Sequence, residues 1–398
     1  MNKKKGIKNM SKKLRCIVSA HISDVHFGAF DSDELLKELK YQFLNKLRHL
    51  PQLDVIYIQG DLYHYELSLN SKHARNSFTF LDLLLQIAYE KNAKVRIIVG
   101  TRSHDFNQLN NIMSMRKDVD IRVINRVQEE ELFTDYRVLY LPEEYIKDPD
   151  EYYYDYFNVD DGYYNAIVGH GFFEENCFSN HNSETVMKAA PIFNSKQLIR
   201  ICNGPITFGH DHSATHIKKK IFYTGSFSRW CQGEEEPKGF FISINNVYNE
   251  NFKIIPIENI MARKFVSRTI TKLLKKYEVE TIINIINEYM EIHNIFNFRL
   301  IAFEVNDSSI MTKLSILQSH LRNNKNINLV IKKNSMVIDE EEINDEILEK
   351  YDYLFDDGIE LEEKVSTYIN TEFSYNISNE RVDEILNGDI IKLINDRM

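Results

Sequence analysis

The strongest constraint on the fold of this 398-residue chain is a repeated alternation of two kinds of segment. Apolar runs with the character of strands span residues 14–21, 54–59 and 94–99, and apolar residues recur with helical spacing over 33–50 and 72–91. Such alternation predicts a parallel or mixed sheet whose strands are joined by helices. Because ligands collect beyond the carboxyl ends of strands in such sheets, we expect a functional site at one sheet edge.

Short fragments containing Asp, His or Gly follow these runs, and two more follow the apolar runs at 165–170 and 205–210. In chain order the fragments are Asp24-Val25-His26, Gly60-Asp61, Ser103-His104, Gly169-His170 and Gly209-His210-Asp211-His212. Singly, each has an ordinary interpretation, such as an Asp that caps a helix or a surface His, and a His-x-His pair alone is a weak signal. As an ordered set at strand ends, they predict a metal site.

The ligand types indicate the chemistry of that site. Carboxylates mixed with imidazoles suit Mn²⁺, Fe²⁺ or Zn²⁺ better than Ca²⁺ or Mg²⁺. The candidates are too many for one ion, and two ions bridged by a carboxylate form the arrangement used for displacement at phosphorus. We take Asp61 as the candidate bridge and His104 as the candidate proton donor to the leaving oxygen.

Charge is unevenly distributed along the chain. The net charge is −10, but residues 339–363 alone hold 13 carboxylates and one lysine, and residues 1–338 carry +4. A polyanionic partner is therefore allowed for the bulk of the chain, and the acidic run itself is ordinarily just a solvated face. Residues 215–223 predict a hairpin with a basic tip, and Lys218–Lys220 and Arg229 are candidate phosphate contacts. An ordinary exposed turn is an equally good interpretation of that tip.

The N-terminus and the cysteines bear on the cellular compartment. Residues 1–13 are rich in lysine but lack the apolar segment of a signal peptide, so we expect a disordered lead-in. No run approaches the roughly 20 apolar residues of a membrane span, and no membrane partner is expected. The cysteines are scattered, which favours free thiols in a cytoplasmic protein over a disulfide framework or a zinc ribbon. They are Cys16, Cys177, Cys202 and Cys231.

The later part of the chain changes character. We expect antiparallel strands over 240–244 and 252–257, and an irregular surface segment over 148–164. Near residue 260 the pattern becomes helix–strand–helix–strand without metal-type residues. The remainder predicts two or more helices.

The ordered fragments resemble the signature of the calcineurin-like metallophosphoesterases. Gly60-Asp-Leu-Tyr-His64 with Tyr223-Thr-Gly-Ser-Phe-Ser-Arg-Trp230 is similar, within them, to SbcD-type DNA double-strand-break repair nucleases, in cells or phages. The resemblance covers residues 15–258 by motif. It implies an α/β/β/α sandwich with two sheets over 14–258. It also implies a small α+β capping domain over 259–338 and, over 339–398, an acidic linker and helices that dock on an SbcC-type coiled-coil ATPase.

Residue by residue, the resemblance implies two Mn²⁺-type ions and two catalytic histidines, His64 and His104. The first ion would take Asp24, His26, Asp61 and His212, and the second would take Asp61, His170, His210 and Ser103. One departure stands out, because the family has Asn where this chain has Ser103. Either water fills that gap, or the second ion binds weakly, or Ser103 is not a ligand.

These interpretations predict a DNA exonuclease and endonuclease that works with an SbcC-like ATPase in end processing, repair or recombination, with homodimerisation left open. One alternative is a phosphoesterase of the same fold acting on a small molecule or a phosphoprotein. The other is a non-catalytic scaffold that binds DNA ends. The additional domains, His64 and the charge of residues 1–338 favour DNA as the substrate.

Overall fold

A computed structural model describes residues 15–105, 108–115, 118–175, 191–303, 307–332 and 366–367 of the chain. The expected lead-in over 1–13 and nearly all of the expected C-terminal helices lie outside the described residues. The chain divides into two compact units, of which the first comprises Met1–Ala302 and Ser308–Val330. The second comprises Phe303–Asp307 and Ile331–Met398. Both large sheets belong to the first unit.

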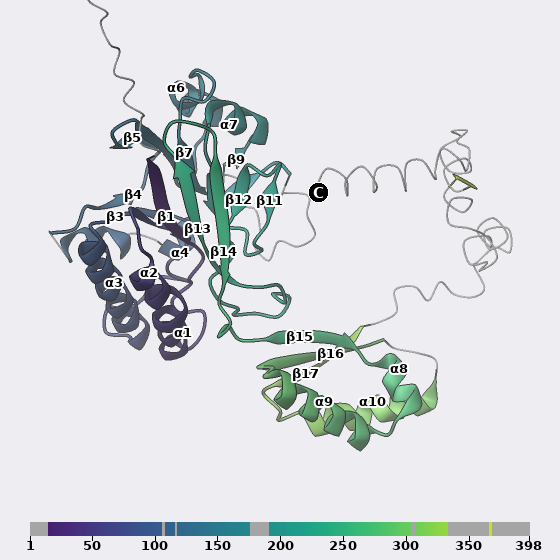
Figure 1. Cartoon of the computed structure of the whole chain (residues 1–398). Coiled ribbons are helices and arrows are strands. Elements are labelled where there is room, and N and C mark those ends of the chain that lie inside the picture. Colours follow the sequence, from purple (N-terminus) through teal and green to yellow (C-terminus); the bar gives the residue numbers. More distant parts are fainter. Residues whose placement is uncertain are drawn as a thin grey trace, which may run out of the picture. The chain divides into compact units, whose positions relative to one another are not determined.

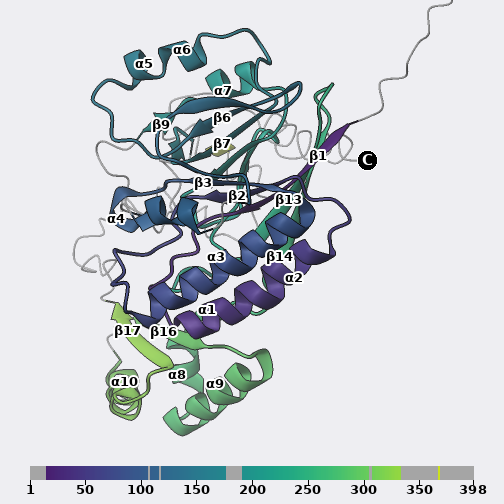
Figure 2. The ribbon, with the colours of Figure 1, turned by 90° about the vertical axis from the view of Figure 1, so that its left-hand side faces the viewer.

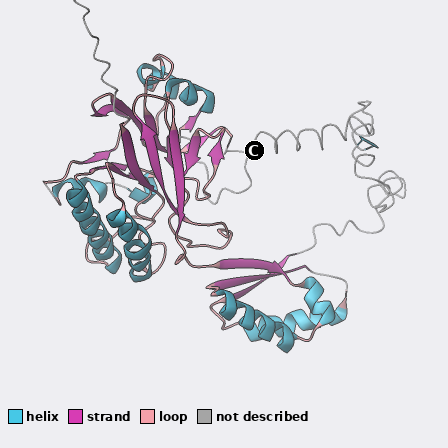
Figure 3. Cartoon of the chain, viewed as in Figure 1, coloured by secondary structure: helices cyan, strands magenta, loops and turns pink. Residues whose placement is uncertain are grey.

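The centre of this unit is a pair of mixed sheets of six strands each (Figures 1 and 3). The first sheet has the order β14 (Phe252–Glu258), β13 (Gly239–Asn246), β1 (Cys16–Ile22), β2 (Val55–Gln59), β3 (Lys94–Ile98) and β4 (Ile121–Ile124). The second has the order β11 (His216–Ile217), β12 (Ile221–Tyr223), β10 (Ile206–Gly209), β7 (Ala166–His170), β6 (Tyr136–Leu141) and β5 (Gln128–Phe133).

The strands that precede the predicted site fragments run parallel to their neighbours. β1, β2, β3 and β4 are parallel in the first sheet, and β6, β7, β10 and β12 are parallel in the second. The five strands with a predicted apolar run begin and end within about two residues of it; they are β1, β2, β3, β7 and β10. The two antiparallel strands predicted after residue 239 are confirmed as β13 and β14. The carboxyl ends of the parallel strands in each sheet therefore share one edge.

Figure 2 shows the helices and sheets of this unit, and three apolar clusters hold these layers together. One joins helices α1 (Ser32–Glu38) and α3 (Lys72–Lys91) to the first sheet, through Leu35, Leu81 and Ile56 among others. A second lies between the sheets, where Tyr57 of β2 and Tyr140 of β6 are buried together. The third joins helix α7 (Ser195–Ile201) to the second sheet. The two mixed sheets are thus packed on one another and flanked by helices, as the predicted two-sheet α/β sandwich requires.

Helix boundaries follow from local chemistry. The segment predicted over 33–50 consists of α1 (Ser32–Glu38), a π-helical stretch (Leu39–Leu44) and α2 (Asn45–His49). Asp31 caps it, since its side chain accepts hydrogen bonds from two backbone N–H groups of the first turn. The predicted helix over 72–91 is α3 (Lys72–Lys91). It ends at Asn92, which adopts the left-handed conformation common at helix ends.

The predicted hairpin over 215–223 is confirmed. β11 and β12 pair antiparallel, and Lys218 and Lys219 have φ values of 51° and 54° in the turn. The segment over 148–164, expected to be irregular, contains two short helices, α5 (Pro149–Tyr152) and α6 (Tyr154–Phe157). Asp148 caps α5 by accepting a hydrogen bond from Glu151 N, with Pro149 in the first turn. Their length, under two turns, leaves no helical period for the sequence to display.

Within the described residues from 260 to 332, the chain builds a three-stranded sheet and three helices. The strand order is β15 (Phe265–Thr269), β16 (Asn297–Phe303) and β17 (Ile327–Lys332). The helices are α8 (Thr271–Lys276), α9 (Val279–His293) and α10 (Ser308–Leu321). The sequence predicted α9, β16, α10 and β17 but missed β15 and α8, which are too short to display a clear period. A fourth, small sheet pairs β8 (Phe172–Phe173) with β9 (Ile192–Phe193).

The structure bears on two of the expectations about the cellular compartment. Cys16, Cys202 and Cys231 are free thiols, as predicted, and Cys177 lies outside the described residues. In the part of the chain that is described, none of the helices combines the length and apolar character needed to cross a bilayer.

Glu38 gives the fold a measurable pH dependence. Its carboxylate is buried at the end of α1 and accepts a hydrogen bond of 2.8 Å from Asn259 Nδ2. Burial raises its pKa from 4.5 to about 7. The folded state therefore holds a proton that the unfolded chain releases, and the free energy of unfolding falls as the pH rises from 4.5 to 7.

We predict that Glu38→Gln, which keeps the accepting oxygen without the charge, stabilises the protein at pH 8 by up to about 3 kcal/mol. At pH 4.5 the variant and the original chain should have similar free energies of unfolding. Urea denaturation at both pH values, with EDTA present, measures this. Glu90→Gln, at an exposed carboxylate 4.0 Å from Arg48, is the control and should change little at either pH.

Candidate metal centre

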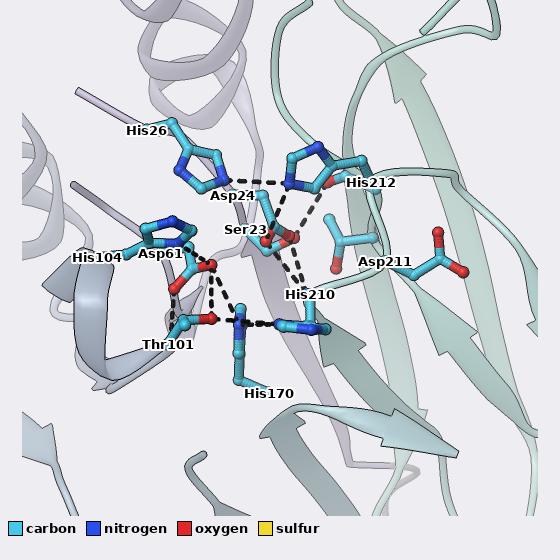
Figure 4. Close-up of polar contacts among 12 residues, drawn as sticks. Ser23, Asp24, His26, Asp61, Thr101, His104, His170, His210, Asp211 and His212 are labelled. Atoms are coloured by element: carbon cyan, nitrogen blue, oxygen red, sulfur yellow. Dashed lines mark hydrogen bonds and ion pairs between the residues drawn. The ribbon is translucent and has the colours of Figure 1, made fainter. Parts of the chain in front are cut away.

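Side chains from both sheets converge where the carboxyl ends of the parallel strands meet (Figure 4). Asp24 and His26 follow β1, and His212 follows β10. Potential ligand atoms of these three buried residues lie within 4.8 Å of one another. His26 Nε2 is 3.1 Å from His212 Nε2, and His212 Nε2 is 3.9 Å from Asp24 Oδ1. We call these three residues the first set.

The second set consists of Asp61, His170 and His210, which follow or end β2, β7 and β10. His170 Nε2 lies 3.0 Å from His210 Nδ1 and 3.4 Å from Asp61 Oδ2. Asp24 lies next to this set as well, because both of its carboxylate oxygens accept from the backbone N of His210, at 3.2 and 3.1 Å. Six predicted ligands from four distant parts of the chain are thereby brought together.

Hydrogen bonds behind the rings fix which nitrogen faces each set. His170 Nδ1 donates to the backbone carbonyl of Gln59 at 2.8 Å, so the neutral ring directs the lone pair of Nε2 inward. His212 Nδ1 lies 2.8 Å from Glu234 Oε1, which does the same for His212. Partners of this kind orient metal-ligating histidines and increase their basicity. With the tautomers set in this way, inward nitrogens only about 3 Å apart repel one another unless a cation or a proton lies between them.

The spacing of the inward atoms also fits an ion. Ligands about 2.1 Å from a common ion are about 3.0 Å apart in neighbouring octahedral positions and about 3.4 Å apart in a tetrahedron. The separations within the second set, 3.0 and 3.4 Å, match these values. Burial of both sets and their mixed carboxylate and imidazole donors are compatible with divalent cations.

The backbone at the centre is strained. Asp24, His26, Asp61 and His210 have φ values of 50°, 53°, 51° and 95°, in the region that side-chain-bearing residues rarely adopt. Each such residue costs of order 1 kcal/mol and persists only where the surrounding structure holds it in place. These sharp turns direct side chains from strand ends into a common space.

Glycines permit the close approach of the two sheets. A Cβ at Gly60, whose φ is +83°, would lie 2.1 Å from His170 Nδ1. A Cβ at Gly209 would lie 2.2 Å from the carbonyl oxygen of Gln59, which is the oxygen that accepts from His170. Gly209 therefore lets β10 pass close to β2.

His64 and His104 lie beside the two sets and are only partly buried. Together with His26 they form a third group whose nitrogens lie within 4.8 Å. His104 Nδ1 is 2.8 Å from Asp61 Oδ2, and the rings of His64 and His104 are stacked, with centroids 5.5 Å apart. Trp230 packs edge-on against His64, with centroids 4.8 Å apart.

Electrostatics link the sets. Burial acts to raise the pKa of Asp61, but the neighbouring charges of His170 and His104 lower it well below its usual range. Burial likewise acts to lower the pKa of His170, but Asp61 outweighs burial and raises it well above 6.5. Burial and His212 hold the pKa of His26 well below 6.5, while burial raises the pKa of Asp24. A proton on His170 thus occupies the position that a cation would take, and the two compete.

Ser103 differs from the other predicted ligands in that it is exposed. It lies in the short helix α4 (Arg102–Asp105) and its side chain is exposed, because the helical turn directs it outward. Thr101, at the start of that turn, faces the centre instead. Its backbone N donates to Asp61 Oδ1 at 2.6 Å, and its hydroxyl lies 3.1 Å from Asp61 Oδ2.

Sequence reasoning also missed two buried glutamates. Glu234 lies behind His212, and Glu143, which follows β6, places Oε2 3.2 Å from His210 Nδ1. Burial acts to raise the pKa of Glu143, but His210 lowers it below its usual range. Glu143 could have been found by its place two residues beyond a strand, which is the same signal that identified Asp61. The sequence around Glu234 offers no such signal.

The expected phosphate contacts have different environments. The Arg229 guanidinium is buried and donates to the backbone carbonyls of Glu236 and Arg263, so it stabilises a loop and is not available to a ligand. Lys218 and Lys219 are exposed at the hairpin tip. Lys220 Nζ donates to the carbonyl of Asn203 at 2.6 Å.

Comparison with known proteins adds little. No family model matches this chain, and no curated protein matches it. Among solved structures, one matching chain is 12% identical, with a TM-score of 0.34, and the match covers 61% of this chain and 100% of the other. A likeness at that level supports no inference about fold or activity.

We predict that Gly60→Ala weakens Mn²⁺ binding at least about 10-fold, because the new methyl group must displace His170. Isothermal titration calorimetry measures this. Gly162→Ala is the matched control, since Gly162 also has a positive φ and its Cβ would displace Asn203, which belongs to neither set. Both variants should lose stability, by about 1–2 kcal/mol from backbone strain alone, but Gly162→Ala should bind Mn²⁺ normally. Equal affinities for the two variants would contradict the assignment.

We also predict that Glu234→Gln lowers Mn²⁺ affinity by about 10- to 100-fold, because His212 loses a charged partner that orients its ring. The same titration measures it. Glu235→Gln is the control: this neighbouring carboxylate contacts Arg268 and the backbone of Ser267, outside the centre, and its loss should leave the affinity unchanged.

Proposed function

We propose that this chain is a two-metal phosphodiesterase of the calcineurin-like metallophosphoesterase type that hydrolyses DNA, as SbcD-type nucleases do. The observation that carries the proposal is the convergence of two buried ligand sets beside a partly exposed histidine pair. Asp61 belongs to the second set, and its charge also acts on His26 and Asp24 of the first. That position suits a carboxylate shared by two ions.

Two divalent ions, Mn²⁺ by the ligand types, would supply water activation and neutralisation of phosphate charge. The chain's own residues account for the other requirements. The strained turns at Asp24, Asp61 and His210 hold the ligands in position before substrate binds. Buried walls exclude bulk water from the ligand sets.

His104 is suited to proton transfer. Its Nδ1 lies 2.8 Å from Asp61 Oδ2, which orients the ring, and its side chain is 13% exposed. The other ring nitrogen can then give a proton to the leaving oxygen of a phosphodiester at the open side of the centre. His64, stacked on His104, would position the scissile phosphate.

DNA as the substrate is supported by the net charge of +4 on residues 1–338 and by the exposed lysines of the β11–β12 hairpin. Contacts of this kind are to phosphate and independent of base sequence. We further propose an SbcC-like ATPase as the partner. Its expected docking helices, within 339–398, lie outside the described residues, and homodimerisation remains a prediction as well.

We predict that His104→Gln lowers Mn²⁺-dependent cleavage of linear DNA by about 10²- to 10⁴-fold while the affinity for Mn²⁺ is retained. Gel assays on labelled linear DNA, beside a chromogenic phosphate ester and a Mn²⁺ titration, measure this. Cleavage of the ester without cleavage of DNA would favour a small-molecule phosphoesterase. DNA binding without Mn²⁺-dependent cleavage, unaltered by His104→Gln, would favour a non-catalytic scaffold.

A further inference from the structure

Glu143 is a buried carboxylate that the proposed ligand list does not use. It lies just beyond β6, which neighbours β7 in the second sheet, and its side chain is 1% exposed. Tyr145 OH donates to Oε1 at 2.7 Å. The other oxygen, Oε2, points into the second set, 3.2 Å from His210 Nδ1 and 3.6 Å from His170 Nε2.

The separation of Oε2 from His210 Nδ1 is that expected between ligands of one ion. Bonds of about 2.1 Å place neighbouring ligands about 3.0–3.4 Å apart. Oε2 meets that spacing against His210 and is slightly beyond it against His170. The Thr101 hydroxyl lies 3.2 Å from Oε2 and 3.1 Å from Asp61 Oδ2, between the two carboxylates. A hydroxyl carries one proton, so it can donate to only one of these oxygens at a time.

The charges of the carboxylates and the tautomer of His170 also favour Glu143 as a ligand. Because His170 donates through Nδ1 to Gln59, its Nε2 lies favourably beside Glu143 Oε2 only when a proton or a cation is between them. Asp61 and Glu143 together place two negative charges against the second set, which balances one divalent cation. A buried carboxylate is costly unless its oxygens are satisfied; Tyr145 satisfies Oε1, and a cation would satisfy Oε2.

We propose that Glu143 is a ligand of the second cation and takes the role that the sequence motif gives to Ser103. This inference rests on the proposed two-metal function and changes its chemistry. A carboxylate replaces a neutral hydroxyl as the ligand. The second ion together with its ligands would then have a smaller net charge, and the ion would bind more tightly than with a serine ligand. The exposed side chain of Ser103 then has no part in coordination.

The test is the number of Mn²⁺ ions bound by the full chain, measured by isothermal titration calorimetry, together with the electron paramagnetic resonance signal of a spin-coupled Mn²⁺ pair. Glu143→Gln keeps the oxygen that accepts from Tyr145 and removes the charge. We expect two ions in the original chain. In Glu143→Gln we expect at least about 100-fold weaker binding of one of them, with the pair signal replaced by that of isolated Mn²⁺.

Two variants serve as controls. Glu144→Gln makes the same change one residue away, at a carboxylate that accepts from Val127 N and Tyr152 OH. Ser103→Ala removes the hydroxyl of the sequence-based ligand. Both should retain two ions and the pair signal. Thermal unfolding without metal should show that all three variants are folded.

Two ions bound by Glu143→Gln with unchanged affinity, or loss of one ion in Ser103→Ala, would overturn the assignment, as would a single ion in the original chain. The DNA assay separates this inference from the proposed function. If Glu143→Gln binds two ions and cleaves DNA normally, only the inference fails. If the second ion depends on Glu143 but the original chain does not cleave DNA, the inference stands and the nuclease proposal fails.

Discussion

The register between the two large sheets depends on Gln59, at the end of β2. Its buried side chain donates to the carbonyl and hydroxyl oxygens of Thr207 and accepts from Thr224, at 2.7, 3.0 and 2.9 Å. Its backbone carbonyl accepts from His170 Nδ1. One residue of the first sheet is thus bonded to three segments of the second. A shift of either sheet along the other would leave these polar groups unpaired, at about 1–3 kcal/mol for each.

This register brings the candidate ligands of the two sheets together at one centre. Each ligand set combines side chains from both sheets, so neither sheet holds a complete set. Gly60 and Gly209 permit the contact distance, and the left-handed turns at Asp24 and Asp61 aim the side chains across it. The packing between the sheets therefore determines the chemistry at their edge.

Most of the strands of the two sheets and most of the candidate ligands could be predicted from the sequence. Six ligands were identified because each lies at or just beyond the end of an apolar run, and the carboxyl ends of parallel strands share one sheet edge. These ligands are Asp24, His26, Asp61, His170, His210 and His212. Ser103 was chosen by its place before His104, but a helical turn exposes it, and the hydrogen-bonding pattern that makes this turn leaves no mark on the sequence. Glu143 was not identified because carboxylates often follow strands. Only the position of the facing sheet distinguishes this one as a candidate ligand. Packing between the sheets decides which residues face one another across them. Periodicity within one segment carries no information about that pairing.

The division of each ligand set between the sheets has a mechanical consequence. A cation held there would fasten two layers that otherwise adhere through apolar contact and the Gln59 network. Chelation would release that fastening at the strand ends alone, while the apolar layer around Tyr57 and Tyr140 stays closed. Amide hydrogens near residues 23–27, 60–63 and 209–213 would then exchange faster in the apo protein, whereas those at the opposite ends of the same strands would keep their protection.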